Sequence, residues 1–238
     1  RFVAEVGSFF NDDIDLALDY LEMSYEAGVD IFKTEILHTG DVCLDSAEVQ
    51  VTYNTAKSKV TENYRSFIER KIINLSDYEI LFRRSIDRGI PIIATIFDIE
   101  GINFLKANGG SAVKIARNNV RNYSLIEAAA KSGLTVIFDL GDVLMSEAIK
   151  ASEIIKDFDV EDIIFNYHPR FNPSLEVDHD LRSIQRYKTI LQAPIGLSCH
   201  YAGDLLLYAA VGAGANLLEK GVDINPERKE ADLVSACS

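Results

Sequence analysis

The chain has 238 residues, of which 47% are hydrophobic and 26% charged, and its formal net charge is −13. This length allows one sizeable core, and no apolar run reaches the roughly 18 residues that a membrane span requires. The acidity excludes nucleic acid as a partner, because phosphate backbones are bound by basic stripes and the chain has no Lys/Arg block. Three widely spaced cysteines form neither a disulfide framework nor a metal motif, which favours a reducing, cytoplasmic setting.

A repeating pattern runs through the chain: a helical stretch, a glycine or short polar break, and a short apolar run that ends in polar residues. Eight such runs occur, within residues 1–7, 26–35, 87–98, 107–117, 131–142, 159–169, 192–200 and 212–220. The stretches between them carry apolar faces at helical spacing, made of Leu125, Ile126, Ala129 and Ala130 in one case and Ile14, Ala17, Leu18, Leu21 and Tyr25 in another. Glycines ahead of the runs are typical of helix C-caps.

Short apolar strands that alternate with helices indicate parallel strands buried on both faces. We therefore predict an α/β fold, a (β/α)8 TIM barrel, with an open doubly wound sheet as the lesser alternative. Residues 37–75 form a long polar insertion, which we expect at the mouth as a loop with partial helix. Only 18 residues follow Lys220, so we expect the last helix to be missing or truncated, and the single domain of residues 1–238 to be a fragment of a longer protein.

Parallel barrels build their functional sites at the carboxyl ends of the strands. Those ends carry Glu5, Lys33, Glu35, Thr95, Asp98, Lys114, Arg117, Asp139, Asp142, Asn166, His168, Ser198, His200, Glu219 and Lys220. The lysines and the arginine favour anion binding, and the carboxylates and histidines add acid–base or metal-binding capacity. Inert pairing is the alternative interpretation for Glu219 with Lys220 and for Arg117 with Asp139. We expect His168 on the surface or in a loop.

Seven short motifs occur in the order in which one enzyme family carries them. They are AEVG (4–7) followed by Asn11 and Asp13, FKTE (32–35), ATIFD (94–98), VKIAR (113–117), IFDLG (137–141), GLSCH (196–200) and LLEK (217–220). Together they resemble the catalytic barrel of the sialic acid (N-acetylneuraminate) synthase family. The resemblance implies a transferase that condenses phosphoenolpyruvate with an N-acylated sugar aldehyde to a 3-deoxy-ulosonic acid, with Mn²⁺ or Mg²⁺ as cofactor.

The resemblance also assigns roles to individual residues. It implies Glu5 and Lys114 as catalytic residues, Lys33, Thr95, Lys114, Arg117 and Ser198 as phosphoenolpyruvate ligands, Glu35 and Asp232 as sugar contacts, and His200 as a metal ligand. A homodimer is implied as one option for assembly.

The chain departs from the family pattern at the site. Gly221 stands where the family has its second metal-binding histidine, Phe9 and Phe10 replace polar residues, and Arg117 and Asp139 replace two serines. The family's C-terminal antifreeze-like domain is not represented in the sequence. A second hypothesis is therefore a catalytically altered or inactive family barrel that binds sugar or phosphate or serves a structural role in glycan biosynthesis. A third is a lyase or aldolase that uses Lys114 or Lys33 as a Schiff base.

Overall fold

The computed structural model describes residues 1–55, 58–160, 162–224 and 233–237, and its parallel strands close into an eight-stranded barrel. The barrel strands are β1 (Phe2–Gly7), β2 (Ile31–Ile36), β5 (Ile92–Ile96), β6 (Ala112–Ile115), β7 (Thr135–Asp139), β8 (Ile163–Tyr167), β9 (Ile195–Cys199) and β10 (Leu218–Gly221). Each pairs with the next in this order, and β10 pairs with β1. Six strands lie within the runs predicted from the sequence, and β2 and β10 extend one residue beyond theirs, so the (β/α)8 TIM barrel is confirmed and the open sheet is excluded.

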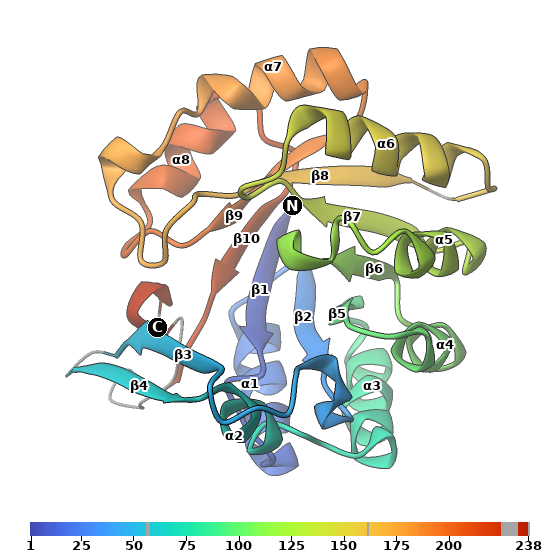
Figure 1. Cartoon of the computed structure of the whole chain (residues 1–238), viewed down its shortest axis with the longest axis vertical. Helices are drawn as coiled ribbons and strands as arrows, with labels where there is room; N and C mark the ends of the chain where they lie inside the picture. The colour runs from blue at the N-terminus through green and yellow to red at the C-terminus, as the bar shows by residue number, and fades with distance from the viewer. Residues whose placement is uncertain (56–57, 161, 225–232, 238) are drawn as a thin grey trace.

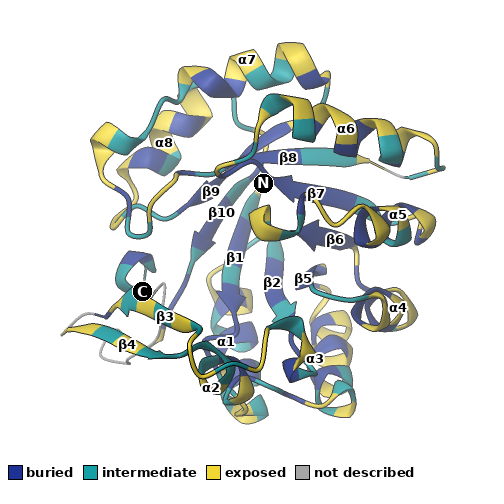
Figure 2. Ribbon diagram, in the orientation of Figure 1, coloured by how far each residue is buried: buried dark blue, intermediate teal, exposed yellow. Residues whose placement is uncertain are grey.

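Helices surround the barrel as an outer ring (Figure 1). They are α1 (Ile14–Glu26), α3 (Leu75–Arg88), α4 (Ile99–Ala107), α5 (Tyr123–Lys131), α6 (Met145–Lys156), α7 (Arg182–Leu191) and α8 (Leu205–Gly212). The predicted apolar face of α5 is its buried face. In α1, Tyr20 and Ser24 are buried, whereas Tyr25 is 45% exposed, so the predicted face was partly wrong. Figure 2 shows how burial is distributed, with buried strands inside and exposed outer faces on the helices.

The insertion at 37–75 contains more regular structure than we predicted. It holds the turn η1 (Gly40–Val42), an antiparallel hairpin of β3 (Gln50–Asn54) and β4 (Lys59–Asn63), and the short helix α2 (Tyr64–Glu69). The remaining 3-10 turns are η2 (Arg117–Asn119), η3 (Glu176–Asp178) and η4 (Leu233–Ser235). Within the described residues no α-helix follows β10. No helix in that part of the chain has the length and apolar character that crossing a membrane requires.

The barrel interior changes from apolar to charged along the strands. Val3, Ile93, Ala112, Ile137 and Leu217 form a buried apolar cluster, with Ile31 and Ile164 packed against it. Side chains two residues apart on a strand point to the same face, so the next inward-facing layer consists of Glu5, Lys33, Thr95, Lys114, Asp139, Asn166, Ser198 and Glu219. The apolar layer thus seals the barrel beneath a charged layer at its carboxyl end.

Close packing at Gly196 provides a test of the barrel interior. A Cβ atom at Gly196 would lie 2.3 Å from Asn166 Oδ1 and 2.9 Å from Leu217 Cβ. We expect Gly196→Ala to lower the free energy of unfolding by about 1–3 kcal/mol through overpacking, measured by urea denaturation. Gly212→Ala is the matched control, because a Cβ there meets nothing within 4 Å, and it should be neutral or slightly stabilising. Equal effects of the two substitutions would contradict the packing at Gly196.

Candidate functional site

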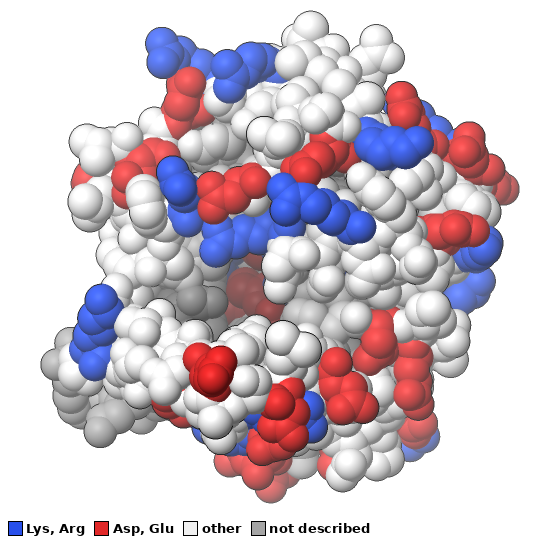
Figure 3. Space-filling model, viewed as in Figure 1, with Lys and Arg blue, Asp and Glu red and all other residues white. Residues whose placement is uncertain are grey.

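A cavity of about 530 Å³ opens at the carboxyl ends of the barrel strands. The charged side chains of this layer line its floor, and side chains from the insertion, including Val42, Val51, Tyr64 and Phe67, line its outer wall. Figure 3 shows the molecule hollowed near its centre, with acidic side chains inside the hollow and Lys and Arg side chains along one border. A partly apolar cavity of this size with convergent charged groups is typical of a small-molecule site.

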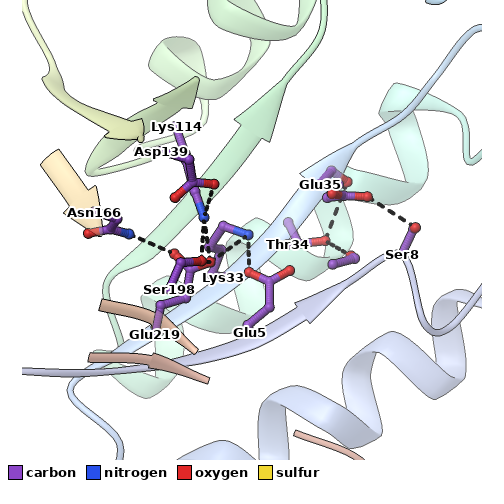
Figure 4. Close-up of polar contacts among 11 residues, drawn as sticks. Glu5, Ser8, Lys33, Thr34, Glu35, Lys114, Asp139, Asn166, Ser198 and Glu219 are labelled. Atoms are coloured by element: carbon purple, nitrogen blue, oxygen red, sulfur yellow. Dashed lines mark hydrogen bonds and ion pairs between the residues drawn. The ribbon is translucent and has the colours of Figure 1, made fainter. Parts of the chain in front are cut away.

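Two buried lysines and three carboxylates form the floor of the cavity (Figure 4). Lys33 from β2 pairs with Glu5 from β1, and its Nζ lies 3.7 Å from Glu219 of β10. Lys114 from β6 pairs with Glu219 and lies 3.0 Å from Asp139 of β7. Glu219 therefore links the two lysines, and the floor contains one more carboxylate than ammonium group.

Hydrogen bonds hold Glu219 in this bridging position. Ser198 Oγ donates to Glu219 Oε1 over 3.0 Å, and Asn166 Nδ2 donates to Oε2 over 3.4 Å. Burial alone would raise the pKa of Glu219, but the charges of Lys114 and Lys33 outweigh it and hold that pKa at about 2. Glu219 is consequently a permanent carboxylate at neutral pH.

The two lysines differ in acidity because they face different surroundings. Burial lowers the pKa of Lys33 to about 8, although Glu219 opposes this shift. Burial acts on Lys114 in the same direction, but Asp139 and Glu219 outweigh it and raise its pKa to about 12. Lys114 is therefore a fixed cation, whereas Lys33 can release a proton near neutral pH.

The structure places the described site residues in two groups. Glu5, Lys33, Thr95, Lys114 and Ser198 lie together on the floor, and Arg117, Glu35 and His200 line the same cavity farther out. The Arg117 side chain is 41% exposed at the rim, and Glu35 Oε2 accepts a hydrogen bond from Ser8. Asp232, predicted to contact the sugar, lies outside the described residues.

The two inert ion pairs that the sequence allowed, Arg117 with Asp139 and Glu219 with Lys220, do not form. Arg117 Nη1 lies 3.6 Å from Asp142, and Asp139 pairs with Lys114 instead. Lys220 points away from Glu219, because adjacent residues of a strand face opposite sides, and its ammonium donates to the carbonyl of Tyr201. Glu219 is thus a central residue of the floor and not an inert partner of Lys220.

His168 lies in the loop after β8, as predicted, but this loop position is part of the site. It follows β8, lines the cavity, and has its ring centroid 4.7 Å from that of His200, which follows β9. Burial lowers the pKa of His168. Burial also lowers the pKa of His200 well below its usual value, and the nearby His168 and Lys114 add to this second shift. Both imidazoles are therefore neutral at pH 7. Their places after adjacent strands were the only sequence signal for this pair.

The position of the family's second metal-binding histidine is held by Gly221, which lines the cavity and has no side chain to bind a metal. A Cβ atom at Gly221 would lie 3.5 Å from Ala236 Cβ and 3.8 Å from a ring carbon of Phe9. Phe9, which replaces a polar family residue, lies within van der Waals contact of this position and adds no ligand to it. The residues present do not fit the family's histidine pair, and we assign no catalytic step to a metal there.

The fold and the strand-end site define a barrel of the kind on which enzymes build active sites. The model of the NeuB family matches residues 20–238, and the chain belongs to that family. It is 27% identical over 92% of its length to an N,N'-diacetyllegionaminic acid synthase of Legionella pneumophila and 24% identical over 97% to the human N-acetylneuraminate-9-phosphate synthase. It covers 62% and 64% of those two proteins, so it spans less than two thirds of their length.

A solved structure supports the same assignment. The fold superposes on an N-acetylneuraminic acid (sialic acid) synthetase of Leptospira borgpetersenii with a TM-score of 0.88 and 27% identity, over 99% of this chain and 77% of the other. A truncated 3-deoxy-D-arabino-heptulosonate 7-phosphate synthase of Thermotoga maritima shares the fold at a TM-score of 0.71 and 14% identity.

Proposed function

We propose that this chain is the barrel of a synthase that condenses phosphoenolpyruvate with an N-acylated sugar aldehyde to give a 3-deoxy-ulosonic acid. The observation that carries the proposal is the convergence of Lys33 and Lys114 beside Glu5 and Ser198 on the floor of one cavity. Relatives named as synthases of N,N'-diacetyllegionaminic acid and of N-acetylneuraminate 9-phosphate support this product class.

The floor residues account for binding of an anionic enol donor. Lys33 and Lys114 would hold its carboxylate and phosphate, with hydroxyl donors from Ser198 and Thr95, and Arg117 would bind phosphate oxygens from the rim. This arrangement fixes the enol carbon opposite the aldehyde, which converts the bimolecular condensation into a reaction between positioned groups. Glu35, on the same cavity wall, would contact the sugar.

Glu5 is suited to the proton transfer of the reaction. Its carboxylate is paired with Lys33 and is only partly buried, so it faces both the donor and the open cavity. Water addition to the donor and departure of phosphate require a group that accepts and returns a proton. We assign this role to Glu5 and the role of fixed cation to Lys114.

The acidity of Lys33 predicts the pH dependence of donor binding. Because the pKa of Lys33 is about 8, its ammonium is lost as the pH rises through that value, and the affinity for phosphoenolpyruvate should fall by up to about tenfold per pH unit above it. Calorimetric titration between about pH 7 and pH 9.5 checks this. Lys33→Arg keeps the charge over that range and should remove the decline, whereas an unchanged decline in Lys33→Arg would assign it to another group.

Phosphate release is the direct test of the proposed function. The purified protein, with phosphoenolpyruvate, an N-acyl hexosamine and added Mn²⁺ or Mg²⁺, should release inorganic phosphate and form a 2-keto acid, and Glu5→Gln should lower the rate by about 10²–10⁴-fold. Absence of phosphate release with every N-acyl hexosamine tested would overturn the proposal.

One observation favours the second candidate, a family barrel that binds ligands without the synthase reaction. The two floor lysines are already paired with Glu5, Glu219 and Asp139, so they present little free positive charge to a phosphate. Strong thermal stabilisation by phosphoenolpyruvate together with turnover would reject this candidate, and stabilisation without turnover would favour it. The cytoplasmic setting, the homodimer and the fragment status of the chain stay predictions.

A further inference from the structure

We propose that His168 and His200 form a binding site for a borderline divalent transition metal ion at the mouth of the barrel. The two residues follow the adjacent strands β8 and β9, and their ring centroids lie 4.7 Å apart. Both side chains line the main cavity. At this separation, one nitrogen from each ring can approach a shared ion at roughly 2.0–2.2 Å.

The hydrogen bonding of the two rings leaves nitrogen lone pairs for an ion. His168 Nδ1 lies 2.6 Å from the carbonyl oxygen of Pro169, and since a carbonyl only accepts, Nδ1 carries the proton and Nε2 keeps its lone pair. A metal-binding histidine commonly donates its other ring N–H to a carbonyl in this way, which fixes the ring orientation. Within the described residues no hydrogen bond or ion pair involves the His200 side chain.

The backbone beside His168 is shaped around its ring. A Cβ atom at Gly141 would lie 2.7 Å from His168 Nδ1, so only glycine at this position allows the ring to lie where it does. The loop after β7 therefore fixes the imidazole against the cavity, although His168 itself follows β8. This close approach is independent of the contact between the two histidines.

The site differs in position from the histidine pair that the family resemblance implies. That pair would use the ends of β9 and β10, where Gly221 offers no ligand and Phe9 and Ala236 occupy the adjacent space. The pair found here uses the ends of β8 and β9. His200 would thus share the ion with an imidazole that follows β8, rather than with one at the end of β10.

The donor set indicates the class of metal. No group of three or more His, Cys, Asp or Glu side chains arranged to hold an ion occurs in the part of the chain that the structure describes, so two imidazoles would be the protein ligands and water or substrate oxygens would complete the shell. Imidazole suits Co²⁺, Ni²⁺ and Zn²⁺, whereas Mg²⁺ selects oxygen ligands. We expect binding to strengthen from Mn²⁺ through Co²⁺ to Ni²⁺ and to be weakest for Mg²⁺.

The four histidines of the chain allow a matched experiment. Co²⁺ is titrated into the substrate-free protein, and binding is followed by visible absorption and calorimetry. We expect one ion per chain, and His168→Ala and His200→Ala should each weaken binding by more than the roughly 10–100-fold that loss of an outer-shell partner causes. His168→Asn repeats the test with a residue of smaller volume change, and thermal unfolding of each ion-free variant shows that it is folded.

His38→Ala and His179→Ala are the controls. His38 Nε2 bonds Asp98 over 2.9 Å and His179 Nε2 bonds Ser174 over 2.8 Å, and neither ring lines the main cavity. Both controls should bind Co²⁺ as the parent protein does. Binding that persists in both His168 variants, or the absence of one-site binding in the parent protein, would overturn the proposal. Because no substrate is present, this result does not depend on the proposed synthase reaction.

Discussion

Replacement of Lys114 by methionine should lower the free energy of unfolding by about 3–5 kcal/mol and abolish turnover of phosphoenolpyruvate. The Lys114 ammonium lies 3.0 Å from Asp139 and pairs with Glu219, and all three side chains are buried. Without Lys114, Asp139 loses its ion-pair partner and Glu219 keeps only Lys33, 3.7 Å away. Urea denaturation at neutral pH measures the loss of stability, and phosphate release measures the loss of activity.

The pH dependence of this loss follows from Glu219. Its pKa is about 2 in the folded protein against an ordinary value of 4.5, so its contribution to stability is present above about pH 4.5 and is lost as the pH falls toward 2. Lys114 supplies the larger part of that contribution. The difference in stability between the parent protein and Lys114→Met should therefore shrink as the pH is lowered through this range.

Two further variants test whether the loss of stability comes from the buried ion pairs of Lys114. Lys106→Met removes an exposed lysine from α4 and should change stability by no more than about 0.5 kcal/mol. Lys114→Met combined with Asp139→Asn should recover part of the loss, because it removes one of the stranded carboxylates. A Lys114→Met protein as stable as the Lys106→Met protein would contradict the charged floor described above.

The barrel could be predicted because its signals are local. Each strand is a continuous apolar run, since parallel strands are buried on both faces, and α5 has the helical periodicity of a one-sided face. The hairpin of β3 and β4 was missed because it lies in a mostly polar segment whose alternate strand positions are exposed, and its two strands pair with each other rather than with the barrel. Tyr25 was wrongly predicted on the buried face of α1, because the helix buries Tyr20 instead, whose hydroxyl donates to Asp223.

The residues of the site could be predicted from the strand ends, but the ion pairs among them could not. The alternation of side chains brings Glu5, Lys33, Lys114 and Glu219 to one interior layer, and this can be read from the sequence once the strands are placed. Which lysine neutralises which carboxylate depends on strand order around the closed barrel. Arg117 and Asp139 end adjacent strands and suggested a pair, yet Lys114 faces inward beside Asp139 whereas Arg117 lies outward at the rim.

Asp139 defines the second large effect that we expect. It stands where the family carries a serine, it is 4% exposed, and its Oδ1 has no hydrogen-bond partner within the described residues. A carboxylate at this point repels a phosphate group and also neutralises Lys114, which lies 3.0 Å away. Asp139→Ser should therefore raise the affinity for phosphoenolpyruvate by about 10–100-fold, equivalent to roughly 1.4–2.8 kcal/mol. Isothermal titration calorimetry at constant ionic strength measures this change.

The control for Asp139→Ser must remove the same charge without touching the cavity. Asp157→Ser does so, because Asp157 caps the carboxyl end of α6 and is exposed, and screening by salt leaves little of its field at the site. Unchanged affinity in Asp139→Ser would show that the phosphate lies elsewhere, whereas weaker binding would show that Asp139 serves the donor through Lys114. A gain in affinity accompanied by a gain in turnover would show that Asp139 restrains an otherwise competent synthase site. A gain in affinity alone would show that the remaining departures, at Gly221 and Phe9, limit the reaction instead.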